Sequence, residues 1–187
     1  LESAHASAES MLEVLNQLLD LSKIDAGKME LRVEACNLGN LIKNISRTFS
    51  ALAHKNNTTV SCHVCPEMAE SLMADGTRLG QILHNLISNA IKFRKPDVNP
   101  SIKITGKKLS AMEVTKEFAL NPRYKNYVKI IVADNGIGFD EKYTDQIFNV
   151  FQRLHGKNEF EGTGIGLAIC KKIVSHHGGI ISAKSIE

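Results

Sequence analysis

Apolar side chains recur at helical spacing in four stretches of the chain, and each stretch predicts an α-helix. The second stretch begins after Asn37, an expected helix cap, and the third runs from Asp75 through Phe93. The fourth covers about residues 164–177. The first, residues 1–25, is expected to end at the glycine of "DAGKME" and carries a heptad-like stripe of Leu1, Ala4, Ala8, Met11, Leu15 and Leu18.

Alternating or β-branched apolar runs between these stretches predict the strands. They cover residues 29–35, 58–64, 70–75, 101–109, 127–134 and 179–186. Residues 110–126 are predicted to be a polar excursion of a hairpin, and residues 140–151 to begin as a helix. Because helices and strands interleave while hairpin-like links exclude an all-parallel sheet, the expected fold class is α/β. We expect a two-layer α/β sandwich with one mixed sheet and one helical face.

Composition narrows the classes of protein that fit. The 187 residues suffice for one domain and an extra element, and 43% hydrophobic with 23% charged residues is typical of a globular protein. A net charge of +3, without a basic stripe among aromatics, does not favour nucleic-acid binding. The apolar stretches are too short to span a membrane. The pair Cys62 and Cys65 lies in a strand-like run, and we interpret both as structural.

The run "FEGTGIGLAICKKIV" places Gly162, Gly164 and Gly166 before the last predicted helix. It is not a dinucleotide fingerprint, because neither the sixth residue from Gly162 nor that from Gly164 is glycine or alanine. No Gly-Lys-Ser/Thr follows, so it is not a P-loop either. The helix start would still offer backbone N–H groups to a phosphate. A plain loop before a helix is an equally acceptable interpretation of this run alone.

A second group of polar side chains could meet such a ligand. Asn85, Asn89 and Lys92 follow one another at i, i+4 and i+7, so they share one face of the third predicted helix. Amide oxygens suit Mg²⁺ and a lysine suits phosphate oxygens. Asp134 ends an apolar strand, where its carboxylate could accept a hydrogen bond from an amino group. Taken singly, each could instead be a solvated or turn-forming residue.

Four motifs, in this order, resemble those of sensor histidine kinases. "NLISNAIKF" resembles the N box, "DNGIGF" the first glycine box, "IFNVFQR" the F box and "GTGIGLAICKKIV" the second glycine box. The resemblance covers roughly residues 29–187 and extends to the ATPase superfamily that includes DNA gyrase, a heat-shock chaperone and mismatch-repair proteins. It implies the Bergerat fold, with ATP and Mg²⁺ as cofactors. "LNQLLDLSKIDAGKMEL" resembles the second helix of the kinase dimerisation hairpin.

The resemblance implies a role for each matching residue. Asp134 would accept from the adenine amine, Asn89 would bind Mg²⁺ with Asn85 beside it, and Lys92 would contact phosphate. Asn85 and Lys92 would thus act at the reacting phosphates. Residues 149–163 would form the ATP lid, and Arg153 is a weaker candidate for phosphate contact, since a solvated arginine fits equally. The implied pocket and phosphate-binding residues are completed by Gly136, Gly138, Gly162, Thr163, Gly164, Gly166 and Leu167.

The resemblance also predicts an organisation and partners. Residues 1–27 would be a partial dimerisation helix, and residues 28–187 the catalytic ATP-binding domain, shortened at its C-terminal end. Expected partners are ATP, a response-regulator receiver domain and a second copy bound through the leading helix. A cytoplasmic location is implied, with any membrane attachment supplied by other parts of a longer parent. None of the seven histidines has the acidic and proline neighbours of a phosphoacceptor, so the chain is expected to be part of a kinase.

Three functions are compared with the sequence motifs. The leading hypothesis is the catalytic part of a histidine kinase, which passes the γ-phosphoryl group of ATP to a histidine outside this sequence and then to an aspartate of a response regulator. A hydrolytic ATPase would need a glutamate one turn before the N-box asparagine, and Asn85 occupies that position. A non-enzymatic ATP-binding module would be expected to have degraded motifs, whereas all four are intact.

Overall fold

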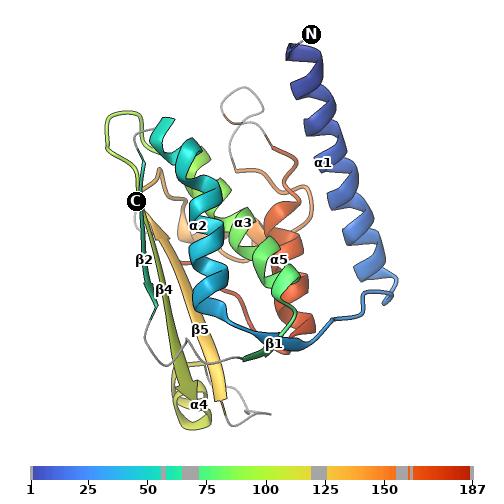
Figure 1. Cartoon of the computed structure of the whole chain (residues 1–187), viewed down its shortest axis with the longest axis vertical. Coiled ribbons are helices and arrows are strands. Elements are labelled where there is room, and N and C mark those ends of the chain that lie inside the picture. The colour runs from blue at the N-terminus through green and yellow to red at the C-terminus, as the bar shows by residue number, and fades with distance from the viewer. Residues whose placement is uncertain are drawn as a thin grey trace. The chain divides into compact units, whose positions relative to one another are not determined.

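The computed structural model describes residues 2–55, 58–64, 72–118, 126–154, 160 and 162–185 (Figure 1). The chain divides into two compact units, Val33–Ile137 on the one hand and Leu1–Arg32 with Gly138–Glu187 on the other.

The unit of residues 33–137 holds the strands. β1 (Glu34–Cys36) pairs antiparallel with β3 (Leu72–Ala74), with Ala35 opposite Met73. β2 (Thr59–Val64) runs parallel to β4 (Ser101–Ser110), and β4 runs antiparallel to β5 (Asn126–Asp134). The order β2-β4-β5 therefore makes a mixed sheet, as predicted.

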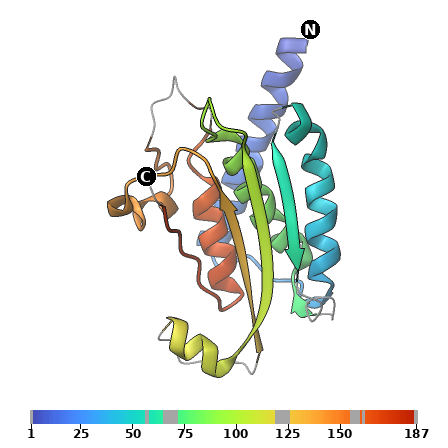
Figure 2. The ribbon, with the colours of Figure 1, turned by 90° about the vertical axis from the view of Figure 1, so that its left-hand side faces the viewer.

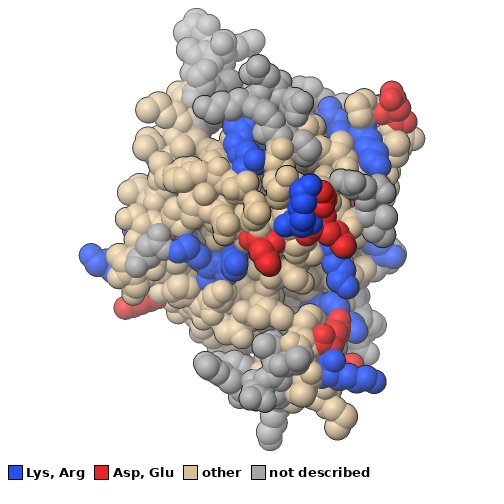
Figure 3. Space-filling view, turned by 180° about the vertical axis from the view of Figure 1, so that it is seen from behind, with Lys and Arg blue, Asp and Glu red and all other residues tan. Residues whose placement is uncertain are grey.

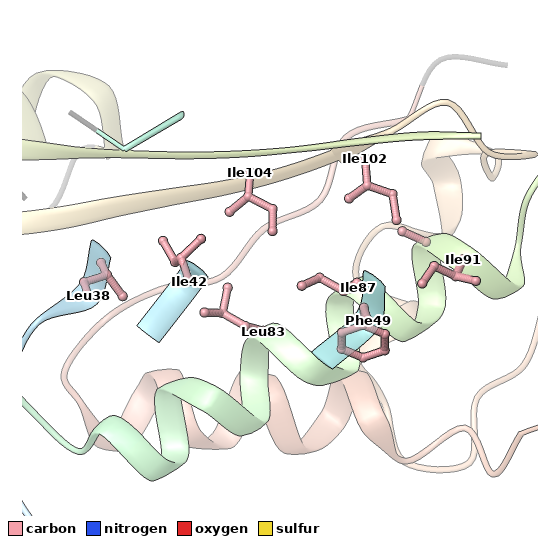
Figure 4. Packing of buried hydrophobic residues seen from close by; sticks show 9 residues of the cluster. Leu38, Ile42, Phe49, Leu83, Ile87, Ile91, Ile102 and Ile104 are labelled. Atoms are coloured by element: carbon pink, nitrogen blue, oxygen red, sulfur yellow. The ribbon is translucent and has the colours of Figure 1, made fainter. Parts of the chain in front are cut away.

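Two amphipathic helices cover one face of this sheet (Figure 2). They are α2 (Leu38–Lys55) and α3 (Gly76–Lys92). Asn37 caps α2, because its Oδ1 accepts the Asn40 N–H at 2.9 Å, and Asp75 caps α3 by accepting the Arg78 N–H at 3.0 Å. Figure 4 shows the core between the helices and β4, formed by Leu38, Ile42, Phe49, Leu83, Ile87, Ala90, Ile91, Ile102 and Ile104. The predicted sandwich with one helical face is confirmed.

The segment between β4 and β5 differs from the prediction, because residues 111–118 form α4 (Ala111–Phe118). Ser110 and Glu113 make a reciprocal cap: the Ser110 N–H donates to Glu113 Oε2 at 2.7 Å and the Glu113 N–H to Ser110 Oγ at 3.3 Å. Lys107 and Lys129 stand opposite each other in the sheet, and Glu117 of α4 pairs with Lys129. Basic and acidic side chains are interspersed on the face seen in Figure 3.

The other unit holds α1 (Glu2–Asp25), α5 (Gly166–His176) and two short 3₁₀ turns, η2 (Glu141–Tyr143) and η3 (Gln146–Phe148). α1 contacts α5, and the buried side chains of α1 are Leu21 and Ile24 among its described residues. α1 ends at Asp25, and the predicted glycine, Gly27, follows it with a φ of 65° that allows the Lys28 N–H to reach the Lys23 oxygen at 2.9 Å.

Two predicted strands are corrected by the structure. Of the strand predicted at 29–35 only residues 34 and 35 pair, as part of β1, because the described residues of the partner β3 are three, Leu72–Ala74. Residues 179–185 form no strand, since alternation of apolar side chains does not supply the ladder of hydrogen bonds that defines one. Residues 140–151 begin with helical turns as predicted, and these turns are the 3₁₀ elements η2 and η3.

Candidate functional site

Helix α3 presents the predicted amide and lysine residues on one face. Its buried side chains are Ile82, Leu83, Ile87, Ala90 and Ile91, while Asn85, Asn89 and Lys92 are half-buried. The predicted spacing is therefore confirmed, because the apolar positions turn these three side chains away from the core. Lys92 Nζ lies 4.3 Å from the centre of the Phe93 ring, which places the ammonium against an aromatic face at the end of the helix.

The turn after β5 is fixed by hydrogen bonds in which Asp134 takes part. Asp134 is exposed, and its Oδ1 accepts the Gly136 N–H at 2.8 Å, an Asx turn. The next residue, Asn135, accepts the Ser101 N–H at 2.7 Å and donates to the Asn99 carbonyl at 3.0 Å. These hydrogen bonds thus hold the carboxylate of Asp134 in place at the C-terminal end of β5.

Gly136 packs where no side chain fits. A Cβ on Gly136 would lie 2.5 Å from the Phe93 carbonyl oxygen and 2.7 Å from Asp134 Oδ1. The same carbonyl accepts the Ile137 N–H at 2.9 Å, so the turn is bound to the C-terminal end of α3. Lys92 and Asp134 are therefore brought to the same region of the unit of residues 33–137. Sequence reasoning missed Phe93 and Asn135, although "DNG" is a recognisable turn signal.

The glycine run before α5 forms a tight turn in the other unit. Gly162 has φ 145° and Gly164 has φ 72°, a region that favours glycine. A Cβ on Gly164 would lie 2.8 Å from the Gln152 carbonyl oxygen. Ile165 is 1% exposed and precedes the first helical residue, Gly166, with Leu167 next along the helix. The N-terminal end of an α-helix carries the positive end of the helix dipole, which favours a bound anion.

Arg153 holds the backbone that leads into this turn. Its guanidinium donates to the Gly162 carbonyl at 2.9 Å and to the Phe160 carbonyl at 2.5 Å, and the side chain is half-buried. These two contacts hold the guanidinium against the backbone, and its contact with phosphate stays a prediction. Thr163 is also half-buried, and its hydroxyl oxygen accepts the Ile165 N–H at 3.3 Å.

The remaining predicted residues are placed in part. Gly138 has φ 71°, so glycine is the residue that this turn requires, and the adjacent Phe139 N–H donates to Ser185 Oγ at 2.9 Å. Lid residues 155–159 and 161 lie outside the described residues, as do Cys65 and the side chain of Cys62. Within the described part of the chain no three His, Cys, Asp or Glu residues cluster as a metal site, and no helix is long and apolar enough to cross a membrane.

A comparison with protein families matches residues 74–187, more than half of the chain, to the histidine kinase-, DNA gyrase B-, and HSP90-like ATPases. The mixed sheet with helices on one face is the architecture of a histidine-kinase-like ATPase domain. The chain belongs to this ATPase family and is a catalytic domain homologous to sensor histidine kinases.

Individual relatives agree with this assignment. Cyanobacterial phytochrome A of Nostoc sp. is 35% identical over 181 residues, which cover 94% of this chain and 20% of that protein. Hybrid signal transduction histidine kinase D of Dictyostelium discoideum is 31% identical and covers 100% of this chain and 11% of its own length. The chain thus spans about a fifth or less of these relatives.

Solved structures share the fold. The catalytic domain of histidine kinase ThkA is 28% identical with a TM-score of 0.60, and the match covers 79% of this chain and 82% of that one. ThkA in complex with the response regulator protein TrrA aligns with a TM-score of 0.63 at 24% identity over 95% of this chain and 46% of that one. The likeness at 24% identity is evidence for the fold.

Proposed function

We propose that the chain binds ATP through Asp134 and serves as the phosphoryl-donating domain of a longer histidine kinase. The observation that carries the proposal is the fixed carboxylate of Asp134. One carboxylate oxygen accepts the Gly136 N–H, and this hydrogen bond also sets the direction of the second oxygen. A carboxylate in that position selects adenine, because the exocyclic amine of adenine is a donor and the corresponding oxygen of guanine is an acceptor.

The phosphates and the metal are assigned to further residues by the motifs. Asn89, with Asn85 one turn earlier, would offer amide oxygens to Mg²⁺, which prefers oxygen ligands. Lys92 would neutralise phosphate oxygens. Backbone N–H groups from Gly162 to Leu167, with Thr163 between the glycines, would complete the phosphate contacts, while Gly136 and Gly138 shape the adenine end. Mg²⁺ supplies charge neutralisation of the transferring phosphoryl group when it is bound.

Transfer to a protein side chain is favoured over hydrolysis. Asn85 occupies the position where hydrolytic members of the superfamily carry a glutamate that takes a proton from water. An amide cannot act as that base. We therefore expect the γ-phosphoryl group to pass to a histidine of the parent kinase and then to an aspartate of a response regulator in the cytoplasm. ThkA, which has been solved with its response regulator protein, offers a precedent for such a partner.

Helix α1 would supply the contact with a second copy. Its exposed apolar side chains are Met11, Leu12, Leu15 and Leu19, with exposures of 66%, 60%, 46% and 57%. Apolar residues at such spacing favour pairing of helices. Residues 1–27 are accordingly proposed to belong to a dimerisation hairpin, and residues 28–187 to the ATP-binding domain.

Titration calorimetry with a non-hydrolysable ATP analogue tests the metal and nucleotide assignments together. We expect micromolar-to-millimolar affinity that rises when Mg²⁺ is added. Asn89→Ala should lose this increase, because the amide ligand is gone. Asn44→Ala, which removes an exposed amide from α2, is the matched control and should bind as the unchanged protein does. An Asn89→Ala protein with full affinity in Mg²⁺ would overturn the metal assignment.

A further inference from the structure

One side-chain hydrogen bond joins α1 to the glycine turn before α5. The Thr163 hydroxyl donates to Gln17 Oε1 at 3.0 Å, between residues 146 positions apart in the sequence. Both side chains are half-buried. The same Thr163 oxygen accepts the Ile165 N–H, so the hydroxyl stands between α1 and the first turn of α5.

Further contacts hold both sides of this hydrogen bond in place in the structure. The turn is held by Gly164, which packs against the Gln152 backbone, and by Arg153, which binds the Gly162 carbonyl. On the other side, Leu21 of α1 is 8% exposed and Ile24 is 5% exposed, so this end of the helix is anchored by burial. Gln17 lies one turn before Leu21 on α1.

A threonine hydroxyl has one proton to donate, and here that proton is given to Gln17. Phosphate oxygens are acceptors and would need the same proton. We infer that Gln17 and the phosphates of ATP compete for the Thr163 hydroxyl, so that α1 acts as a latch that lowers the affinity for ATP. The inference rests on the proposed function, because it requires nucleotide phosphates at this turn.

The competition is reciprocal, as for any two ligands coupled through one group. ATP should release Gln17, and displacement of α1 should strengthen ATP binding. In the parent kinase, a movement of α1 would then be transmitted to the nucleotide without any contact between α1 and ATP. The device would make the affinity for ATP respond to the position of the dimerisation helix.

Substitution of Gln17 tests the latch. Gln17→Met keeps the length of the side chain and removes the acceptor. We expect its ATP affinity to rise about 2- to 12-fold, the factor that corresponds to one neutral hydrogen bond. Adenosine, measured as a competitor, should bind both proteins alike because it has no phosphate. Asn16→Met, at the neighbouring exposed position of α1, is the control and should leave both affinities unchanged.

A double-mutant cycle separates the latch from a general effect on folding. Thr163→Val removes the shared hydroxyl, so adding Gln17→Met to it should produce no further change, whereas in Thr163→Ser the effect of Gln17→Met should persist. An unchanged or lower ATP affinity in Gln17→Met, or an equal gain for adenosine, would overturn the latch while leaving the proposed function intact. Absence of ATP binding by every variant and by the unchanged protein would overturn both.

Discussion

Gly136 and Gly80 show how the surroundings of a single residue decide whether a methyl group is tolerated. A Cβ on Gly136 would lie 2.5 Å from the Phe93 carbonyl, while a Cβ on Gly80 of α3 would meet Ile45 and Leu41 at 3.7 Å, an ordinary contact. The first position is a point of backbone contact. The second is a helix interior, where alanine is preferred to glycine.

We therefore predict opposite signs for the two alanine substitutions. Gly136→Ala should lower the free energy of unfolding by about 1–3 kcal/mol and weaken ATP binding, because the Asp134 turn must move. Gly80→Ala should raise the free energy of unfolding by about 0.5–1 kcal/mol. Urea denaturation monitored by circular dichroism measures both. A Gly136→Ala protein as stable as the unchanged chain would contradict the close approach.

For individual residues, the sequence predicted which side chains lie together on one element. It did not predict contacts between residues that are distant in the sequence. Asn85, Asn89 and Lys92 follow from the helical period alone. The contact of Gln17 with Thr163 depends on how α1 packs on α5, and nothing in the local sequence of either residue specifies that packing. Arg153 was considered as a phosphate ligand or a solvated side chain, yet it binds backbone carbonyls close by.

Among the helices and strands, α4 is an element that the sequence analysis did not predict. The segment between β4 and β5 was predicted as a polar excursion of a hairpin, without a helix. Ser110 and Glu113 have the spacing of a capping box, a signal that could have identified the helix start. The other helices have long apolar stripes, and each was predicted.

The stability of the α4 cap should depend on pH through the carboxyl group of Glu113. Hydrogen bonds from the Ser110 backbone N–H and then from its hydroxyl hold the pKa of Glu113 below its ordinary value. Because the folded-state pKa is lowered, the cap stabilises α4 above the unfolded-state pKa and is lost as pH falls through the folded-state pKa. NMR Cα shifts of residues 111–118 should lose helical character on that acid limb. Glu113→Gln should not show this transition, and helical shifts maintained throughout acidification would contradict the assignment.

The exposed apolar side chains of α1 predict self-association. Leu12→Lys should shift the chain toward monomer in sedimentation velocity, because it places a charge in the apolar stripe. Ser175→Lys adds the same charge at an exposed position of α5 and should leave the association unchanged. Equal behaviour of the two variants across a concentration series would show that α1 is not the contact.

For the whole molecule, the order of strands and helices was enough to predict the mixed sheet and its helical face. The core residues Ile87 and Ile104 lie at positions that fit the apolar period of their elements, a helix for Ile87 and a strand for Ile104. The division into units was not recognisable, since it depends on which segments pack together. Pairing at residues 179–185 was wrongly predicted for the same reason: a strand requires a neighbour as well as a pattern.

The chain alone should bind ATP without phosphorylating itself. None of its histidines has the acidic and proline neighbours of an acceptor. Incubation with γ-labelled ATP should leave no acid-labile phosphate on the chain. Addition of a peptide that carries the acceptor helix of the proposed parent kinase should produce labelled peptide. Stable histidine phosphorylation of the chain without the peptide would contradict this account of the acceptor.

The most direct test of the adenine assignment is the ratio of affinities for non-hydrolysable ATP and GTP analogues, measured by calorimetry for the unchanged protein and for Asp134→Asn. Asparagine keeps an oxygen for the Gly136 N–H and replaces the second acceptor with a donor. The unchanged protein should prefer the ATP analogue by roughly 10-fold or more, the worth of a hydrogen bond to a charged group. In Asp134→Asn this preference should disappear. Equal binding of both analogues by the unchanged protein, or a preference that survives in Asp134→Asn, would contradict adenine recognition by Asp134.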